Sequence, residues 1–285
     1  MSYLKLDHKT ILLLGSGRSG TSWLCDLLAS PFRYRLLFEP FHTAHVPDSE
    51  LAADRYYSPD SVPPPAARFI HRALNDEINS PWIAQSSNRR FNMHRWRFWP
   101  KVNIVKEVRA NLLIPALRAL FGPDLPILVL IRHPGAVVES FLRVEFPWSF
   151  DVSTLMAQDG LQRDYGVPID RLRPYITNLA GQLAVRWVIE NSYLLRCAAT
   201  LDLDIIFYED LVQDRVGYVR HLCTRYKLHE PPNLEENARR LSGTTHKRSP
   251  WYEGAGASGW RQRLSPNDIE QIEAVLEAAG VNYPK

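Results

Sequence analysis

Short apolar runs alternate along the chain with longer stretches in which apolar residues recur at helical spacing. The runs are brief and almost free of polar residues, which is typical of strands in a parallel sheet that is covered on both faces. They lie at residues 11–14, 35–38, 102–105, 126–131 and 203–208. The pattern therefore predicts five strands, of which the first leads directly into a glycine-rich turn.

Helical periodicity occupies much of the chain between and after these runs. The predicted helices are residues 22–28, 112–120, 135–142, 176–197, 211–226 and 266–279. Strands that alternate with helices indicate an α/β fold, in which a parallel sheet is flanked by helices on both faces.

Two regions interrupt this alternation. Residues 42–101 contain Ser-Val-Pro-Pro-Pro at 61–65 and a stretch rich in Trp, Arg and Phe, whereas residues 242–263 are rich in Gly, Ser and Trp. We find no internal repeat and no clear domain boundary, and 285 residues suit one domain with a large insertion. We therefore expect residues 1–285 to form a single domain, with a substrate-side insertion at about 42–101 and a donor-binding loop at 242–263.

Composition narrows the class of protein. Charged residues make up 23% of the chain and leave a net charge of +3, which is too small an excess to indicate nucleic-acid binding. Cys25, Cys197 and Cys223 are too few and too far apart for a disulfide framework or a metal site. The apolar run at 11–14 is too short to span a membrane. The sequence thus predicts a cytoplasmic protein with no membrane span.

Candidate chemistry begins where the first predicted strand ends. Residues 15–22 read Gly-Ser-Gly-Arg-Ser-Gly-Thr-Ser and open a predicted helix. At a helix start the backbone N–H groups lack partners and the helix dipole favours an anion, and glycines let a phosphate approach closely. Thr21 and Ser22 add hydroxyl donors. We interpret the segment as a phosphate-binding loop, although a simple tight turn would also use its glycines.

The loop has the spacing of a Walker A loop but not its chemistry. Four residues separate Gly15 from Gly20, yet Thr21 stands where the lysine belongs and the cation is Arg18 instead. The fourth predicted strand ends in Arg132 rather than in the carboxylate of a Walker B strand. We therefore expect a P-loop-like sheet, and a magnesium-dependent nucleotide or small-molecule kinase is the disfavoured alternative.

A second basic site follows the fourth predicted strand. Arg132 stands at its end, and Ser140 follows two helical turns later. Open α/β sheets bind ligands at the carboxyl ends of their strands, and arginine forks onto phosphate oxygens. A charge at a helix start would explain Arg132 alone. Two phosphate sites at one sheet edge indicate a nucleotide with phosphate at both its 5′ and 3′ ends.

Taken together, these segments resemble the sulfotransferase superfamily, which uses 3′-phosphoadenosine 5′-phosphosulfate as its sulfate donor. The similar motifs are a 5′-phosphosulfate loop at 17–24, a 3′-phosphate motif at 131–134 with Ser140, Tyr-Glu-Asp-Leu at 208–211, a donor loop at 259–265, and the Leu-Phe-Glu-Pro of carbohydrate and bacterial members at 37–40. Their order spans most of the chain outside residues 42–99. Lys106 resembles the lysine of the Lys-x-His motif in the small-molecule branch, but Val108 replaces the histidine.

The resemblance implies which residues bind the donor. They are Gly17, Arg18, Ser19, Gly20, Thr21, Ser22, Arg132, Ser140, Tyr208, Trp260 and Arg261. Further candidates are Trp23, Lys247 and Arg248. For the aromatic residues a place in the core is the alternative, and for the last two a solvated basic pair.

Sulfuryl transfer, by analogy with phosphoryl transfer, should depend on positioning and charge stabilisation. Arg18 would stabilise the sulfonate and the leaving phosphate, and Lys106 would add a second cation, so that no metal is required. We expect Glu39 to be the general base, with its pKa raised by partial burial, unless it pairs with an arginine. His42 and His45 are the reserve bases.

The acceptor side is less defined. Residues 88–99 mix aromatic side chains with arginines, and such a surface stacks on sugars, on aromatic acceptors or on single-stranded bases, or packs as an amphipathic helix. We expect the acceptor to be a hydroxyl, or an amine, of a carbohydrate, lipid or other small molecule. An inactive nucleotide-binding module is a third hypothesis, and the combination of Arg18, Glu39 and Lys106 counts against it. The sequence leaves the acceptor and the oligomeric state open.

Overall fold

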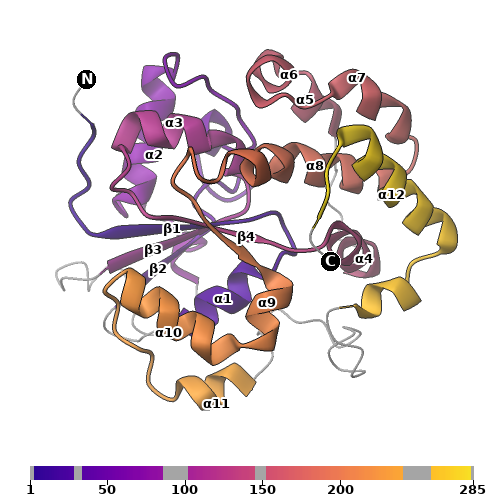
Figure 1. Cartoon of the computed structure of the whole chain (residues 1–285). Coiled ribbons are helices and arrows are strands. Elements are labelled where there is room, and N and C mark those ends of the chain that lie inside the picture. Colours follow the sequence, from indigo (N-terminus) through magenta and orange to yellow (C-terminus); the bar gives the residue numbers. More distant parts are fainter. Residues whose placement is uncertain (1–2, 29–33, 86–101, 145–151, 240–257, 284–285) are drawn as a thin grey trace.

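The computed structural model describes residues 3–28, 34–85, 102–144, 152–239 and 258–283 of the chain. Five parallel strands form its central sheet in the order β2-β3-β1-β4-β5 (Figure 1). The strands are β1 (Thr10–Leu14), β2 (Tyr34–Phe38), β3 (Val102–Glu107), β4 (Ile127–Ile131) and β5 (Asp204–Phe207). All five predicted strands are present, and the parallel sheet is confirmed.

Helices cover both faces of the sheet. They are α1 (Thr21–Leu28), α2 (Pro64–Leu74), α3 (Ile114–Phe121), α4 (Pro134–Val144), α5 (Val152–Met156), α6 (Asp159–Tyr165), α7 (Ile169–Leu172), α8 (Leu179–Cys197), α9 (Tyr208–Gln213), α10 (Arg215–Arg225), α11 (Leu234–Arg239) and α12 (Pro266–Ala279). Short 3₁₀ turns lie at Ser49–Leu51, Ile83–Gln85, Asn111–Leu113, Arg173–Tyr175 and Gly259–Gln262. The predicted α/β fold with helices on both faces is therefore confirmed.

The sheet separates two hydrophobic clusters. Leu12 and Leu14 of β1 point into the larger cluster, with residues of α2, α3, α4, α8 and α12, whereas Ile11 and Leu13 point into the smaller one, with residues of α1, α9, α10 and α11. In Figure 1 the helices of the smaller cluster lie below the sheet. Because both faces are covered, the strands need apolar residues at successive positions, which explains the uninterrupted runs in the sequence.

Capping residues set several helix boundaries. Ser265 accepts a hydrogen bond from Asp268 N at 3.1 Å and begins α12, and Gly280 ends it with φ of 64°, so the predicted helix at 266–279 is confirmed. The predicted single helix at 211–226 is wrong. Asp214 accepts a hydrogen bond from Gly217 N at 2.8 Å and begins α10, which divides the stretch into α9 and α10.

The region that interrupts the alternation contains a helix. The prolines at 63–65 do not form a loop, because Pro64 is the first residue of α2, where its missing N–H costs no hydrogen bond. Asp76, just after α2, forms a buried ion pair with Arg35 of β2, and Arg35 Nη2 lies 2.9 Å from Asp76 Oδ1. This ion pair fastens the first part of the region to the edge of the sheet.

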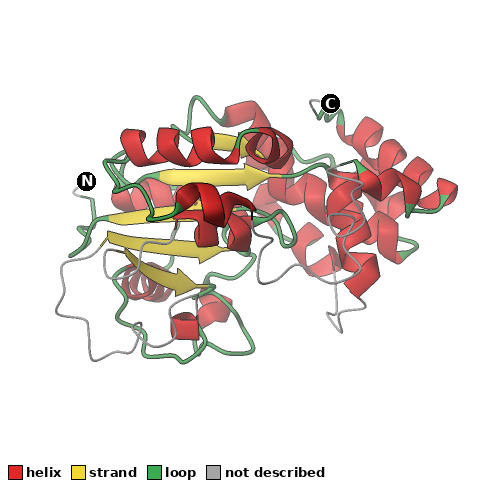
Figure 2. Ribbon diagram, turned by 90° about the horizontal axis from the view of Figure 1, so that it is seen from below, coloured by secondary structure: helices red, strands yellow, loops and turns green. Residues whose placement is uncertain are grey.

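The strands all end on one side of the molecule. In Figure 2 every yellow arrow points toward the larger group of helices, so the carboxyl ends of the strands face that group. The helices α5, α6 and α7, which the sequence pattern did not predict, contribute buried residues to the larger cluster together with α8. None of the helices in the described ranges has the length and apolar content needed to cross a membrane.

We predict that Asp76→Ala lowers the free energy of unfolding by about 3–5 kcal/mol, because it leaves the buried guanidinium of Arg35 without its carboxylate. Urea denaturation measures the change. The control is Glu230→Ala, which removes an exposed partner of Arg220 and should cost at most about 1 kcal/mol. Equal effects of the two substitutions would contradict the assigned role of the buried pair.

Candidate active site

The predicted functional residues lie in a row along the carboxyl edge of the sheet. The strand order brings together Glu39 after β2, Lys106 of β3, the loop at 15–20 after β1, Arg132 after β4 and Tyr208 after β5. The chain leaves β1 toward β2 and leaves β4 toward β5, in opposite directions. The edge between β1 and β4 is thus a topological switch point, where open α/β sheets bind ligands.

The loop between β1 and α1 is packed against its neighbours. A Cβ atom on Gly15 would lie 2.5 Å from Leu130 O, and one on Gly20 would lie 2.7 Å from the Tyr208 ring. Gly20 also has φ of 100°, in the region that side chains disfavour. The glycines of the predicted phosphate loop are therefore required by close packing on β4 and Tyr208.

Helix α8 supports this loop from behind. Asn191 Nδ2 donates to Ser16 Oγ at 2.8 Å, and the Ser16 hydroxyl also hydrogen-bonds the Glu190 carboxylate. All three side chains are buried. Ser16 therefore fixes the loop to α8 and has a structural role, so the candidates for ligand binding are the residues that follow it in the loop.

The same helix supports the segments that follow β2 and β3. Arg186 of α8 forms ion pairs with Glu190, at 2.7 Å, and with Asp54, at 2.9 Å. Asp54 N in turn donates to Arg109 O at 2.8 Å, just after β3. One buried polar network thus supports the loop after β1 and the segment after β3.

Three arginines lie close together beside Ser140, and two of them contact its hydroxyl. Arg18 Nε donates to Ser140 Oγ at 3.0 Å, Arg143 Nη2 lies 3.4 Å from the same oxygen, and Arg132 Nη1 donates to Arg18 O at 3.1 Å. Burial and the charges of Arg143 and Arg132 lower the pKa of Arg18 to about 10, so Arg18 remains a cation at neutral pH. The residues of the two predicted phosphate sites therefore lie side by side, and Arg143, which the sequence motifs did not single out, contacts them.

This cluster contains buried donors without protein partners. Among the described residues, Ser19 Oγ, Arg132 Nε and Arg143 Nη1 are buried and make no hydrogen bond. Buried polar groups are normally paired, so donors left open beside several cations fit an anionic ligand. The cluster therefore suits the phosphates of the predicted donor.

Tyr208 packs beneath the phosphate loop. It is 6% exposed, its ring lies 4.5 Å from the Arg132 guanidinium carbon, and its centroid lies 5.8 Å from that of Trp23. The ring thus holds Arg132 in place through a cation–π contact. A contact of Tyr208 or Trp23 with the donor stays a prediction.

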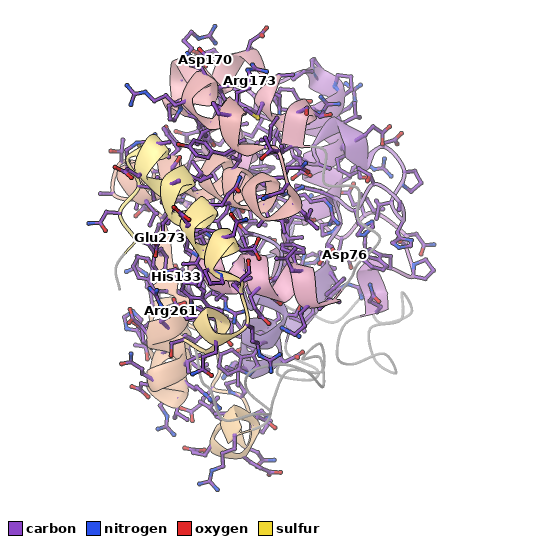
Figure 3. All side chains as sticks on the ribbon, turned by 90° about the vertical axis from the view of Figure 1, so that its right-hand side faces the viewer. Asp76, His133, Asp170, Arg173, Arg261 and Glu273 are labelled. Carbon is purple, nitrogen blue, oxygen red and sulfur yellow. The ribbon has the colours of Figure 1, made fainter. Side chains whose placement is uncertain are left out.

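Trp260 is buried behind the start of α4. Its ring stacks on His133 at 4.5 Å, and a Cβ on Gly135 would lie 2.5 Å from it. Arg261 lies over the outer side of the same ring, and Figure 3 shows His133 and Arg261 close together beside α12. Burial, Arg261 and Arg132 lower the pKa of His133 to about 4, so this ring is neutral. Donor contacts of Trp260 and Arg261 stay predictions.

Glu39 lies in a buried ion-pair cluster. Its Oε1 pairs with Lys106 and its Oε2 lies 3.0 Å from Arg109 Nη1, and the residue is 7% exposed. Burial alone would raise the pKa of Glu39, but the two cations and their hydrogen bonds outweigh it and lower the pKa. The expected upward shift is therefore corrected, and the pairing with an arginine is present.

Glu107 organises the backbone around this cluster. Its carboxylate accepts hydrogen bonds from Phe41 N at 2.7 Å, Val108 N at 2.8 Å and Arg109 N at 3.0 Å. Complete burial raises the pKa of Glu107 to about 7, opposed by Arg109 and reinforced by Glu39. The residue therefore joins the segment after β2 to the one after β3 and positions Arg109.

The reserve bases lie beside Glu39 in an aromatic cluster. The Trp82 ring lies 4.5 Å from His42 and 4.0 Å from His45, and Phe38 contacts its edge. Burial and the charge of Arg109 lower the pKa of His42 to about 4. Its Nδ1 accepts from Ala44 N at 3.3 Å, so neutral His42 carries its proton on Nε2 and cannot accept another there.

Several predicted residues lie outside the described ranges. These are the aromatic and basic stretch at 88–99, Lys247 and Arg248. No group of three His, Cys, Asp or Glu side chains with the geometry of a metal site occurs within those ranges. The absence of a metal requirement stays a prediction.

Solved structures with a similar fold are sulfotransferases. The chain superimposes on the sulfotransferase domain from the curacin biosynthetic pathway with a TM-score of 0.53 and 16% identity, over 99% of this chain and 100% of that one. For the sulfotransferase domain of the Synechococcus PCC 7002 olefin synthase, the TM-score is 0.50 and the identity 17%, over 100% of both chains. No family model and no curated protein matches the chain. The chain therefore has the sulfotransferase fold that its motifs predict.

We predict that Glu107→Gln lowers the free energy of unfolding at pH 7 by about 1–3 kcal/mol. A glutamine places an N–H donor where a carboxylate oxygen now accepts, so at least one of the three backbone N–H groups loses its partner. Chemical denaturation measures the effect. Glu273→Gln, on the exposed side of α12, is the matched control and should change stability by less than about 0.5 kcal/mol.

The pH dependence gives a second readout. The pKa of Glu107 is raised from 4.5 to about 7 in the folded chain, so the folded state binds more protons than the unfolded state between these values. The contribution of Glu107 to stability therefore falls as pH rises through this window. The free energy of unfolding of the wild-type protein, measured relative to that of Glu107→Gln, should therefore fall as pH rises from 4.5 to 7. A difference between the two proteins that does not change with pH would contradict the assignment.

Proposed function

We propose that the protein is a sulfotransferase that moves a sulfuryl group from 3′-phosphoadenosine 5′-phosphosulfate to an acceptor hydroxyl. The observation that carries the proposal is the cluster in which Arg18 and Arg143 contact Ser140 and Arg132 contacts Arg18 O, with buried donors that have no hydrogen-bond partner among the described residues. It lies at the switch point of a sulfotransferase fold. The fold alone would leave the activity open, and this site gives it a chemical basis.

Two parts of the site match the two ends of such a donor. The loop at 17–22 opens α1 and offers backbone N–H groups and hydroxyls to the 5′-phosphosulfate. Arg132 and Ser140, at the start of α4 and within it, would bind the 3′-phosphate. The residues that we propose to bind the sulfate donor remain Gly17, Arg18, Ser19, Gly20, Thr21, Ser22, Arg132, Ser140, Tyr208, Trp260 and Arg261.

The reaction forms one bond and breaks another. The acceptor oxygen forms a bond to sulfur while the bond between sulfur and the phosphate oxygen breaks, and the leaving phosphate keeps the electron pair. Arg18 would balance the charge that develops on the sulfonate and on this phosphate. Glu39 Oε1 would take the acceptor proton, and the products are a sulfate ester and 3′-phosphoadenosine 5′-phosphate.

Lys106 has two proposed roles, and its side chain can fill only one of them at a time. It now neutralises Glu39 Oε1, and as the second cation of the site it would turn to the transferring sulfonate. Once Lys106 leaves, Glu39 retains only Arg109, and its pKa moves upward toward the range that suits a general base. The catalytic roles of Glu39, Lys106 and Arg18 thus require the ion pair to open.

The kinase alternative is not favoured. Thr21 occupies the position of the Walker A lysine, and the strand end that would carry a Walker B carboxylate carries Arg132.

The reserve bases have different surroundings. His42 is the poorer candidate, because its Nδ1 already accepts a hydrogen bond and its Nε2 carries the proton, whereas His45 is exposed. A carbohydrate, lipid or other small-molecule acceptor and a cytoplasmic location are the finer parts of the proposal.

Donor binding is the direct test of this function. We expect 3′-phosphoadenosine 5′-phosphate to raise the melting temperature of the protein, and ADP with magnesium to leave it nearly unchanged, because only the former places a phosphate beside Arg132 and Ser140. Differential scanning fluorimetry measures both. Stabilisation by ADP with magnesium alone would refute the proposal, and a labelled-sulfate screen over sugars, lipids, phenols and amines then identifies the acceptor.

The second functional prediction concerns the base. Glu39→Gln should lower kcat by about 100-fold or more and change the donor Kd little, because general-base catalysis acts on the acceptor proton. Since the pKa of Glu39 is lowered, the wild-type kcat/KM should show no loss from its protonation above about pH 5. Glu273→Gln is the control, and near-normal turnover of Glu39→Gln would assign the base elsewhere.

A further inference from the structure

We propose that Arg143 is a third phosphate-binding cation of the site, that it contacts the 3′-phosphate of the donor, and that Glu139 holds it in position for that contact. The inference rests on the proposed function, since it concerns the same donor. It assigns a binding role to a residue that none of the sequence motifs contains.

The geometry of α4 prepares Arg143 for a ligand. Arg143 Nε donates to Glu139 Oε1 at 2.7 Å, one turn earlier on the helix, and Nη2 lies 3.4 Å from Ser140 Oγ. The side chains of Arg143 and Glu139 are only 10% and 3% exposed. Two nitrogens of the guanidinium are thus occupied, while the third, Nη1, is buried and makes no hydrogen bond among the described residues.

The same kind of open donor occurs on the neighbouring groups. Arg132 Nε and Ser19 Oγ are also buried without a hydrogen-bond partner in the described part of the chain. Arg18 joins Arg143 at Ser140, and Arg132 joins Arg18 through its carbonyl. Open donors on Arg132 and Arg143, which Arg18 and Ser140 link, fit one ligand with several acceptor oxygens, as a phosphate has.

The charges of the cluster point to a dianion. Within the described part of the chain, Arg18, Arg132 and Arg143 bring three positive charges to this cluster and Glu139 one negative charge, which leaves a half-buried excess of two. The repulsion is visible in Arg18, whose pKa is lowered by burial, Arg143 and Arg132. A phosphomonoester carries about −1.5 to −2 charges at neutral pH and would cancel this excess. A ribose hydroxyl at the same place would not.

The position on α4 indicates which phosphate Arg143 meets. Arg143 and Ser140 lie on one helix, which starts directly after Arg132 and His133, and Ser140 and Arg132 are the proposed 3′-phosphate ligands. The 5′ end of the donor would lie on the backbone of the loop before α1. Arg143 therefore serves to distinguish 3′-phosphorylated nucleotides from those with a free 3′-hydroxyl.

Isothermal titration calorimetry with two probes tests this role. The probes are 3′-phosphoadenosine 5′-phosphate and 5′-AMP, which lacks the 3′-phosphate. We expect Arg143→Gln to weaken binding of 3′-phosphoadenosine 5′-phosphate by about 10- to 100-fold and binding of 5′-AMP by less than about 3-fold. The Kd for 5′-AMP divided by the Kd for 3′-phosphoadenosine 5′-phosphate should therefore fall. Arg143→Lys should lie between, because it keeps the charge and loses the fork.

Two controls keep the result interpretable. Arg163→Gln removes an exposed arginine of α6 and should leave both Kd values unchanged. If Arg143→Gln does not fold because it strands the buried Glu139, the double variant Glu139→Gln with Arg143→Gln removes both charges and takes its place.

The outcomes separate the two proposals. If the wild-type protein does not prefer the 3′-phosphorylated probe, the proposed function and this inference both fail. If the wild-type protein prefers it and the Arg143 variants keep that preference undiminished, the function stands and Arg143 is not a phosphate ligand. A selective loss in the variants supports the inference.

Discussion

A parallel sheet that is covered on both faces leaves its strand ends as the place where polar side chains can gather without disturbing the core. In this protein that constraint determines the site. Each strand ends at the same edge, and each delivers one functional element there: Glu39, Lys106, the glycine-rich loop, Arg132 and Tyr208 in turn. The spacing of these residues along the chain has no other common feature, so the strand order is what makes them neighbours.

The two halves of this edge differ in their charge balance. On the acceptor side, Lys106 and Arg109 meet Glu39 and Glu107, so cations and carboxylates are equal in number. On the proposed donor side, the described residues contribute three arginines and one carboxylate, Glu139, which pairs with Arg143. Burial makes an uncompensated charge costly, so the donor side has the stronger need for a charged ligand. Among the described residues, positive and negative charges therefore balance at one end of the edge, and positive charge is in excess at the other.

Much of the fold could be predicted from the sequence, because apolar runs and helical spacing report burial directly. The five strands and the helix at 266–279 follow from that pattern, whereas the break at Asp214 depends on one capping side chain within an otherwise helical stretch. The glycine-rich loop between β1 and α1 could be predicted from local residues. The lowered pKa of Glu39 depends on Lys106 and Arg109 together, which pairing between β2 and β3 brings to it, so the sequence offered an arginine partner only as an alternative. Arg143 was missed for a similar reason, since its importance comes from three arginines that only the fold brings together.

The network on α8 has a consequence for how the proposed activity could change its acceptor. Asn191 and Glu190 hold Ser16 at the donor loop, and Arg186 holds Asp54, which is bonded to the segment that carries Arg109. One helix is therefore the common foundation of both halves of the site. Substitutions that favour a new acceptor should disturb the structure least where they leave the contacts of α8 unchanged. A change that displaces Asp54 would also disturb the loop at 15–20, which is proposed to bind the donor, so changes at the proposed acceptor and donor ends of the edge are coupled through α8.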